Sequence, residues 1–162
     1  MQRKERQLVV FNLGQEEYGV DILQVREIKR LSEIARVPHA PDFVKGVINL
    51  RGNIIPVIDL HKRFDLGETE ATDESRIVIV SVQDITVGIT VDAVSEVITL
   101  TKEALTPPPP LVAGIEASFI EAIGKLKDRL LILLNMDRIL GLDEVAATKK
   151  VAEKAAQEGV AE

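Results

Sequence analysis

Short runs of apolar residues, separated by polar or glycine-containing turns, recur along most of the chain. In the clearest case, residues 47–50 and 54–60 form two runs rich in Val and Ile that flank Arg51-Gly52-Asn53. This composition predicts two antiparallel strands joined by a tight turn. Gly52 can take the positive φ that a three-residue hairpin loop requires, so Arg51 is expected to project from the turn.

Pro56 lies inside the second run of this hairpin. Proline has no N–H to give to a strand ladder, so residues 54–60 are expected to form an edge strand or to carry a β-bulge. A long apolar edge strand would pair with other chains if it stayed uncovered. Either another part of this chain or a partner protein therefore has to cover it.

The same pattern of β-branched residues and short turns predicts further hairpins. They cover three stretches, residues 7–22, 76–91 and 119–135. Residues 22–31 place an apolar side chain at every third position, which fits a short helix or a helical turn that runs into a strand. Residues 40–46 predict one helical turn, with Pro41 near its start and Gly46 at its end.

Residues 143–162 differ in composition from the rest of the chain. They are rich in Ala, Lys and Glu and contain few large apolar residues, which predicts a frayed helix or a disordered tail. We therefore expect a single domain over residues 1–142, followed by a C-terminal helix or flexible tail.

Two sequence echoes indicate an internal duplication. Residues 20–28 and 91–97 both contain Val-Asp followed by Val-x-Glu and an Ile or Val. Residues 50–60 resemble residues 126–136 without any gap. Because the two echoes occur in the same order in both copies, we predict two similar, intertwined β subdomains. Each would be a small curved sheet or barrel, and a pseudo-twofold axis would relate them.

Length, composition and charge limit the possible functions. With 162 residues, of which 46% are hydrophobic, the chain can form one domain or two small ones that share a core. A net charge of −6 with scattered Lys and Arg argues against nucleic acid or an anionic membrane surface as the partner. The chain has no cysteine, which excludes disulfides and thiolate metal sites. No signal peptide or membrane-spanning run is evident, so a soluble cytoplasmic protein is expected.

No catalytic or metal-binding motif emerges from the sequence. His39 and His61 are the only histidines and lack the spacing of a metal site, so both are expected in surface loops. The chain has no glycine-rich phosphate loop, and we expect no cofactor. Acidic residues inside apolar segments are expected to cap turns or to pair with arginines. These are Asp21, Glu27, Asp59, Asp92 and Glu96.

Two of these carboxylates keep an alternative class open. A hydrolase that uses Asp59 or Glu27, or a β-barrel that binds a small ligand, would need a deep pocket and a carboxyl group with a raised pKa. Arg51 favours a different class, because a guanidinium on a turn suits a carboxylate of a partner or an intramolecular pair with Glu27. Together with an apolar strand that needs cover, Arg51 favours a protein-binding module.

Four ordered blocks of sequence resemble the CheW family, the adaptors that couple bacterial chemoreceptors to the histidine kinase CheA. The resemblance covers about residues 7–142, nearly the whole chain. The blocks are QLVVFNLGQEEYGVDILQVREI from residue 7, PHAPDFVKGVINLRGNIIPVIDL from residue 38, RIVIV and VGITVDAVSEV within residues 76–97, and DRLLILLNMDRIL from residue 128. The chain departs from the family pattern at residues 107–110, which are four prolines, and in the C-terminal tail.

The resemblance implies an all-β fold with short helices, made of two five-stranded SH3-like β-barrels around a shared core. It also implies a stand-alone, non-enzymatic adaptor of chemotaxis that links the cytoplasmic tips of chemoreceptors (methyl-accepting chemotaxis proteins) to CheA. One face would bind the regulatory domain of CheA, and a groove between the barrels would take the receptor tip. An adaptor of the same fold that serves another histidine-kinase pathway is the alternative.

The partner-binding positions of the family can be carried over residue by residue. In the first half they fall on Val25, Glu27, Ile28, Gly46, Arg51 and Gly52. In the second half they fall on Val78, Gly88 and Val97. Substitution of Arg51 is expected to weaken partner binding and to leave folding intact. Substitution of Gly52 or Asp21 is expected to lower stability first, because both residues form turns.

Overall fold

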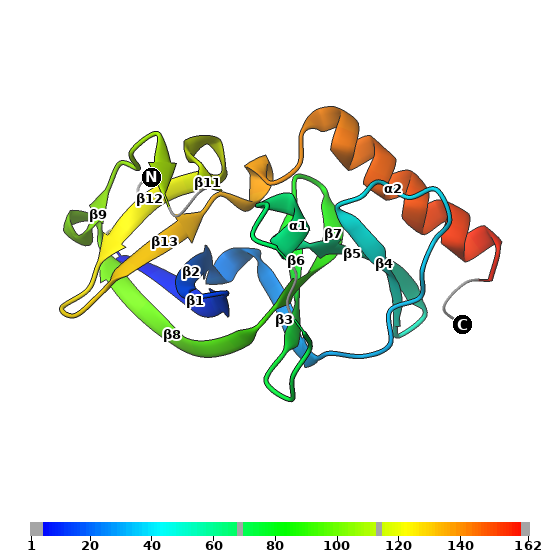
Figure 1. Ribbon diagram of the computed structural model, residues 1–162, viewed down its shortest axis with the longest axis horizontal. Coiled ribbons are helices and arrows are strands. Elements are labelled where there is room, and N and C mark those ends of the chain that lie inside the picture. The colour runs from blue at the N-terminus through cyan, green and yellow to red at the C-terminus, as the bar shows by residue number, and fades with distance from the viewer. Residues whose placement is uncertain (1–4, 68–69, 113–114, 160–162) are drawn as a thin grey trace.

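The computed structural model describes residues 5–67, 70–112 and 115–159 and places most of them in two β-sheets (Figure 1). One sheet, of six strands, lies at one end of the molecule and the other, of five strands, lies at the opposite end with the C-terminal helix across it. The fold is therefore mostly β, as expected.

The six-stranded sheet combines strands from both ends of the sequence. Its order is β8 (Ala93–Thr101), β1 (Glu5–Leu13), β2 (Glu16–Asp21), β13 (Leu130–Leu134), β12 (Ile120–Lys125) and β9 (Leu105–Thr106). All neighbours are antiparallel except β2 and β13, which pair in parallel. A separate small ladder joins β10 (Leu111–Val112) to β11 (Ile115–Glu116).

The five-stranded sheet comes from one continuous stretch of sequence. Its order is β3 (Val25–Arg30), β6 (Arg76–Val82), β7 (Ile85–Val91), β5 (Asn53–Asp59) and β4 (Val44–Leu50). Here β5 and β7 form the parallel pair. The helices are short except the last. They are α1 (Leu60–Arg63), α2 (Leu142–Gln157) and the 3-10 turns η1 (Ile22–Gln24), η2 (Lys102–Ala104), η3 (Ala117–Phe119) and η4 (Met136–Arg138).

The two sheets share one strand order, with the parallel pair at the same place. The strands match as β8 with β3, β1 with β6, β2 with β7, β13 with β5 and β12 with β4. The chain crosses from one sheet to the other after β2 and returns after β7, so the sheets are not successive halves of the sequence. The first sequence echo marks these two crossings, and the second marks the hairpins β4–β5 and β12–β13.

The sixth strand of the larger sheet has a reduced counterpart in the smaller one. After β8 and η2 the chain pairs with β12 through the two residues of β9. After β3 the chain pairs with β4 through one isolated bridge, between Ala35 and Val47. The pairing of this segment is therefore limited to one bridge, and only one of the two sheets has the expected five strands.

Two local predictions are resolved by tertiary contacts. Residues 22–31 form the turn η1 followed by the strand β3, and the Asp21 carboxylate accepts a hydrogen bond of 2.9 Å from the Leu23 N–H. The helical turn predicted over residues 40–46 is limited to one tight turn, in which the Val44 N–H donates to the Pro41 carbonyl oxygen over 2.9 Å. Its predicted extent is wrong, because β4 begins at Val44 and contains Gly46 at a bulge. A Cβ atom on Gly46 would lie 2.2 Å from the Ala35 carbonyl oxygen, so only glycine permits this close approach.

The turn between β4 and β5 has two residues rather than three. Leu50 pairs with Asn53, and both Arg51 (φ 51°) and Gly52 (φ 89°) have positive φ, as in a type I′ turn. The sequence predicts that β5 is an edge strand or carries a β-bulge. It is not an edge strand, because it lies between β4 and β7, and the bulge of its ladder lies on β4, between Val44 and Gly46. However, β7 pairs only with the last three residues of β5, Val57 to Asp59, so it does not pair with Pro56.

The helix α2 supplies the cover that the apolar hairpin requires. Its side chains pack on β5 and β4, with Thr148 and Ala155 fully buried and Val151 nearly so. The Glu144 side chain accepts a hydrogen bond of 2.8 Å from the Gly141 N–H and so caps the helix. The C-terminal segment is therefore an integral helix as far as Gln157. Residues 160–162 lie outside the described part of the chain.

A column of aromatic rings runs through the shared core. Phe11 and Tyr18 of the larger sheet lie 5.9 Å apart, Tyr18 and Phe64 lie 6.2 Å apart, and Phe64 and Phe119 lie 5.5 Å apart, measured between ring centres. Phe64 follows α1 and so belongs to the part of the chain that builds the smaller sheet. One apolar cluster thus joins the two sheets, which gives them a common core.

Candidate functional site

The tip of the β4–β5 hairpin carries an exposed ion pair. Arg51 Nη2 donates to Glu27 Oε2 over 2.8 Å and Arg51 Nη1 donates to Glu27 Oε1 over 3.3 Å. The hydrogen bond from Arg51 lowers the pKa of the Glu27 carboxyl, and the same contact raises the pKa of Arg51. The Arg51 side chain is 71% exposed. It is therefore charged, oriented and accessible to a partner.

A related ion pair lies at the equivalent place in the larger sheet. Arg129, at the β12–β13 turn, donates from Nη2 to Glu96 Oε1 over 3.0 Å and also pairs with Glu17 over 2.6 Å. Glu96 on β8 occupies the position that Glu27 occupies on β3. Val97, beside Glu96, is 53% exposed. Each sheet thus carries an arginine–glutamate pair next to the corresponding hairpin turn.

A groove of about 510 Å³ opens beside the Glu27–Arg51 pair. It forms where the first half of β5 separates from β7, since the two strands pair only from Val57 onward. Its apolar lining comes from Leu50, Ile54, Ile55, Pro56, Ile79 and Ile85. Its charged lining comes from Arg26, Glu27, Arg51 and Lys149. The groove therefore combines apolar surface with three cations and one carboxylate.

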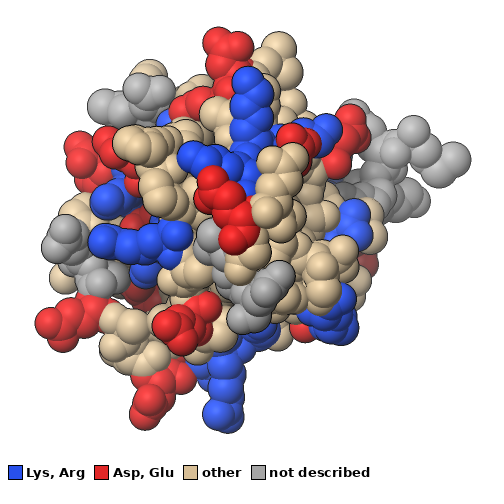
Figure 2. Space-filling view, turned by 90° about the vertical axis from the view of Figure 1, so that its right-hand side faces the viewer, with Lys and Arg blue, Asp and Glu red and all other residues tan. Residues whose placement is uncertain are grey.

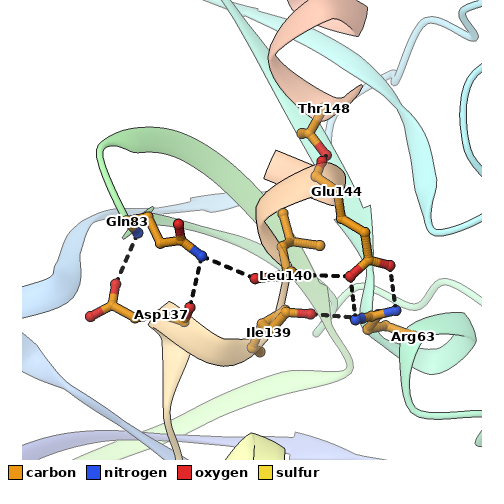
Figure 3. A network of polar contacts seen from close by, with 8 residues as sticks. Arg63, Gln83, Asp137, Ile139, Leu140, Glu144 and Thr148 are labelled. Atoms are coloured by element: carbon orange, nitrogen blue, oxygen red, sulfur yellow. Dashed lines mark hydrogen bonds and ion pairs between the residues drawn. The ribbon is translucent and has the colours of Figure 1, made fainter. Parts of the chain in front are cut away.

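A polar network fixes the start of α2 (Figure 3). Residues further along α2 form one wall of this groove. Arg63 donates to both Glu144 carboxylate oxygens over 2.9 and 2.7 Å and to the Ile139 carbonyl oxygen over 2.7 Å. Gln83 Nε2 donates to the carbonyl oxygens of Asp137 and Leu140, each over 3.0 Å. The segment that leads from β13 into α2 is therefore tied to α1 and to the β6–β7 turn.

The structure brings most first-half site residues together. Val25, Glu27 and Ile28 lie on β3, and Arg51 and Gly52 form the neighbouring turn, which the Glu27–Arg51 contact joins to β3. Ile28 is 40% exposed, so an apolar side chain lies on the same strand as the ion pair.

The remaining expected positions lie elsewhere. Gly46, Val78 and Gly88 are buried inside the five-stranded sheet. A Cβ atom on Gly88 would lie 2.9 Å from the Ile77 side chain, so this glycine permits close packing. Val97 is exposed but lies on the other sheet.

Sequence reasoning missed Arg26, Lys149 and Ala152, which line the groove. Arg26 precedes Glu27, and its exposed side chain donates from Nε to Ser81 Oγ over 2.9 Å. For α2, the available signal was the spacing of small and apolar residues at 145, 148, 151, 152 and 155, which fits one helix face.

The described residues offer little support for the enzymatic alternative. Arg51 lowers the pKa of Glu27, whereas a general acid would need a raised value. The Asp59 side chain accepts a hydrogen bond from the Lys62 N–H and caps α1. His61 is not in a surface loop as expected, because it is buried in α1 with Nε2 2.9 Å from Asp92 Oδ1. Within residues 5–67, 70–112 and 115–159, no group of His, Asp and Glu side chains could hold a metal ion.

The surface charge is mixed in sign. Figure 2 shows Lys and Arg interspersed with Asp and Glu over the end of the molecule that carries β4 and α2. A continuous basic field of the kind that binds nucleic acid is not visible on this face. None of the helices in the described part of the chain is long and apolar enough to cross a membrane.

Comparison with known proteins identifies the family. The model of the CheW-like domain matches residues 7–144. The chain is 37% identical to the chemotaxis protein CheW of Klebsiella aerogenes over 91% of this chain and 89% of that protein. It is 39% identical to the chemotaxis protein CheW of Treponema pallidum over 86% of this chain and 84% of that protein.

A solved structure agrees with the fold. The crystal structure of the scaffolding protein TtCheW from Thermoanaerobacter tengcongensis matches with a TM-score of 0.80 and 40% sequence identity, over 88% of this chain and 92% of that chain. Sequence and strand arrangement point the same way. The chain therefore belongs to the CheW family and is a non-enzymatic scaffolding protein of chemotaxis.

Proposed function

We propose that this adaptor joins the cytoplasmic tips of chemoreceptors to the histidine kinase CheA through separate surfaces, and that the Glu27–Arg51 surface binds the CheA regulatory domain. The observation that carries the proposal is the ion pair itself. Arg51 is 71% exposed at the end of a short turn, and Glu27 holds its guanidinium in place over 2.8 Å. An ordered, accessible guanidinium can donate hydrogen bonds to a carboxylate of the partner with little further loss of conformational freedom.

The neighbouring surface supports a protein partner. The apolar side chains of the groove lie beside the ion pair. Exposed Ile28 pairs with Val78 and points to the other face of β3, so it would contact a partner only at the edge of this surface. Apolar contact area supplies binding free energy, while the charged rim selects the partner and its orientation. Because a receptor array repeats the same contacts many times, each contact can be of moderate strength.

The finer architecture belongs to the same proposal. We infer that each sheet represents one SH3-like barrel of the family, that a pseudo-twofold axis relates them, and that the receptor tip binds an apolar surface between them. Two features support this inference. The two sheets share one strand order. In each sheet the chain also leaves the strand at one edge, β8 or β3, and next pairs with the strand β12 or β4 at the opposite side of the same sheet. We assign residues 1–142 to one CheW-like domain that works in the cytoplasm, at receptor arrays on the inner face of the membrane.

The test is a pair of NMR titrations with the full chain. The regulatory domain of CheA is expected to shift the amide resonances of residues 25–28 and 46–52. A receptor tip is expected to shift a different set at the contact between the two sheets. Arg51→Asp is expected to weaken kinase binding about tenfold, because the change reverses a charge that faces the partner.

The matched control is Lys127→Asp. Lys127 is exposed and occupies the place of Arg51 in the equivalent turn of the larger sheet, so the change in charge is the same. If Arg51→Asp unfolds the protein by circular dichroism, Arg51 is structural and its assigned role is wrong. If wild-type protein shows no shifts with CheA at high concentration, the chemotaxis kinase is not its partner, and adaptors of other kinase pathways become the better model.

A further inference from the structure

One wall of the groove beside Arg51 lies mostly beyond the part of the chain that matches the family. The match ends at residue 144, whereas α2 runs to Gln157. Lys149 and Ala152, in the middle of α2, line the groove together with residues of β3 and β5. The shape and charge of the groove therefore depend on a helix to which the family resemblance assigns no role.

The position of Lys149 is well defined. On one side of α2, Thr148, Val151 and Ala155 are buried against the sheet. At the start of the helix, the two hydrogen bonds from Arg63 hold Glu144. The backbone of Lys149 is thus fixed relative to β5, while its side chain is exposed and can reach a bound partner.

The charge of the groove is opposite to that of the whole protein. Arg26, Arg51 and Lys149 face a single carboxylate, Glu27, which Arg51 already binds. Arg26 donates to Ser81, and neither Arg26 nor Lys149 forms an ion pair with any residue that the structure describes. The chain as a whole carries a net charge of −6. A local excess of positive charge on an acidic protein favours an acidic partner surface.

The apolar side chains of the groove place a second requirement on the partner, in addition to its negative charge. Ile54, Ile79 and Ile85 line it, with Pro56 at the point where β5 separates from β7. A purely acidic, solvated segment would leave this apolar surface exposed to water. An occupant that matches both features carries carboxylates next to apolar side chains.

We propose that this groove, with α2 as one wall, binds a segment of the kinase regulatory domain that combines carboxylates with apolar side chains, and that Lys149 helps to select it. The inference rests on the proposed function, because it specifies the partner chemistry of that same surface. It assigns to α2 a part in recognition, in addition to its part in covering the hairpin. Lys149 acts at the rim of the groove, where a charge affects the rate of association and its dependence on salt.

The first test compares Lys149→Glu with Lys150→Glu by titration calorimetry against the CheA regulatory domain. Both lysines are exposed on α2, but only Lys149 lines the groove. Lys149→Glu is expected to weaken binding about fivefold at low salt, and the difference should shrink at high salt. Lys150→Glu is expected to stay within about twofold of wild type.

Three outcomes separate this inference from the function on which it rests. If Arg51→Asp weakens binding while Lys149→Glu and Lys150→Glu behave alike, the role of α2 is wrong and the proposed function stands. If Lys149→Glu weakens binding and Lys150→Glu does not, the inference holds. If wild-type protein does not bind the regulatory domain, both proposals fail.

A second test identifies the occupant directly. The chain has no cysteine, so Lys149→Cys gives a single thiol to which a photoactivatable cross-linker can be attached. After irradiation of the complex, mass spectrometry is expected to find the label on a regulatory-domain peptide that contains Asp or Glu beside apolar residues. The same label at Lys150→Cys should react far less. Cross-links to a basic peptide, or equal labelling from both positions, would overturn the inference.

Discussion

Arg63 of α1 and Glu144 in the first turn of α2 form a two-pronged ion pair, with N–O distances of 2.9 and 2.7 Å. The same guanidinium lies 5.5 Å from the ring centre of Phe43 and 5.1 Å from that of Phe119. Phe43 precedes β4 of the smaller sheet, and Phe119 precedes β12 of the larger one. Arg63 therefore contacts the segments that lead into both sheets, as well as the C-terminal helix.

Replacement of Arg63 by lysine should weaken its contacts with Glu144 and with the two phenylalanine rings. Lysine keeps the charge but cannot form two parallel hydrogen bonds or stack on two rings. We expect Arg63→Lys to lower the free energy of unfolding by about 1–3 kcal/mol, measured by urea denaturation. Amide hydrogen exchange in α2 should accelerate as well. Arg138→Lys, at an exposed position of η4, is the control. Equal stability of the two variants would contradict the role given to Arg63.

Gly46 should tolerate no side chain. A Cβ atom there would lie 2.2 Å from the Ala35 carbonyl oxygen, so the bridge between Ala35 and Val47 would have to open. Gly46→Ala is expected to destabilise the protein by about 3 kcal/mol or more. Gly52→Ala is the comparison. A Cβ atom on Gly52 would have no other atom within 4 Å, so this substitution introduces only the strain of a positive φ, which costs about 1 kcal/mol. Thermal unfolding of both variants checks the order, and a Gly46→Ala protein as stable as Gly52→Ala would refute the steric account.

Local patterns were sufficient to predict the hairpins. The hairpin predicted over residues 76–91 appears as β6 and β7, and the one over residues 119–135 contains β12 and β13. In each case the turn and the two apolar runs are neighbours in sequence, so pairing them requires no information from elsewhere in the chain. The duplicated arrangement was predictable for the same reason, because both copies keep the same local residues.

Errors occurred where distant segments decide the structure. Pro56 predicted an edge strand or a β-bulge, but β7 pairs with β5 in parallel from the following residue onward, and that partner is remote in sequence. Pro41 and Gly46 predicted a helical turn, but Gly46 is needed where the chain near Ala35 approaches β4. Proline and glycine mark both turns and close contacts, and sequence alone does not separate the two.

The candidate site was only partly predictable. The Glu27–Arg51 pair followed from residue types on a predicted turn and strand. Lys149 did not, since α2 buries small residues such as Thr148 and Ala155, which carry little hydrophobic signal. Small side chains let a helix approach a sheet closely, so burial here depends on the tertiary fold rather than on composition.

Tyr18 gives a pH prediction that needs no variant. Its ring is fully buried, and burial, with a smaller contribution from Glu16, raises the pKa of its hydroxyl to about 12. Since the folded protein favours the neutral phenol, this contribution to stability is complete below the unfolded pKa of about 10 and is lost as the pH rises through about 12. Tyr18 is the only tyrosine, so phenolate absorbance reports it alone. A native midpoint near the value found in denaturant would contradict the burial argument.

Glu27 gives the complementary prediction in acid. The hydrogen bond from Arg51 is the main reason that the pKa of Glu27 is lowered, and the charges of Arg51 and Lys29 act in the same direction. A depressed pKa means that the pair stabilises the protein above the unfolded pKa of about 4.3 and that this contribution is lost as the pH falls through the folded value. Arg51→Gln should raise the Glu27 pKa toward its ordinary value, measured by carboxyl NMR titration, whereas Lys127→Gln should leave it unchanged.

If a carboxylate of the partner displaces Glu27 from Arg51, the Glu27 pKa should also rise in the complex. Binding would then take up protons in mildly acidic buffer, and binding without proton uptake would show that Arg51 keeps its contact with Glu27.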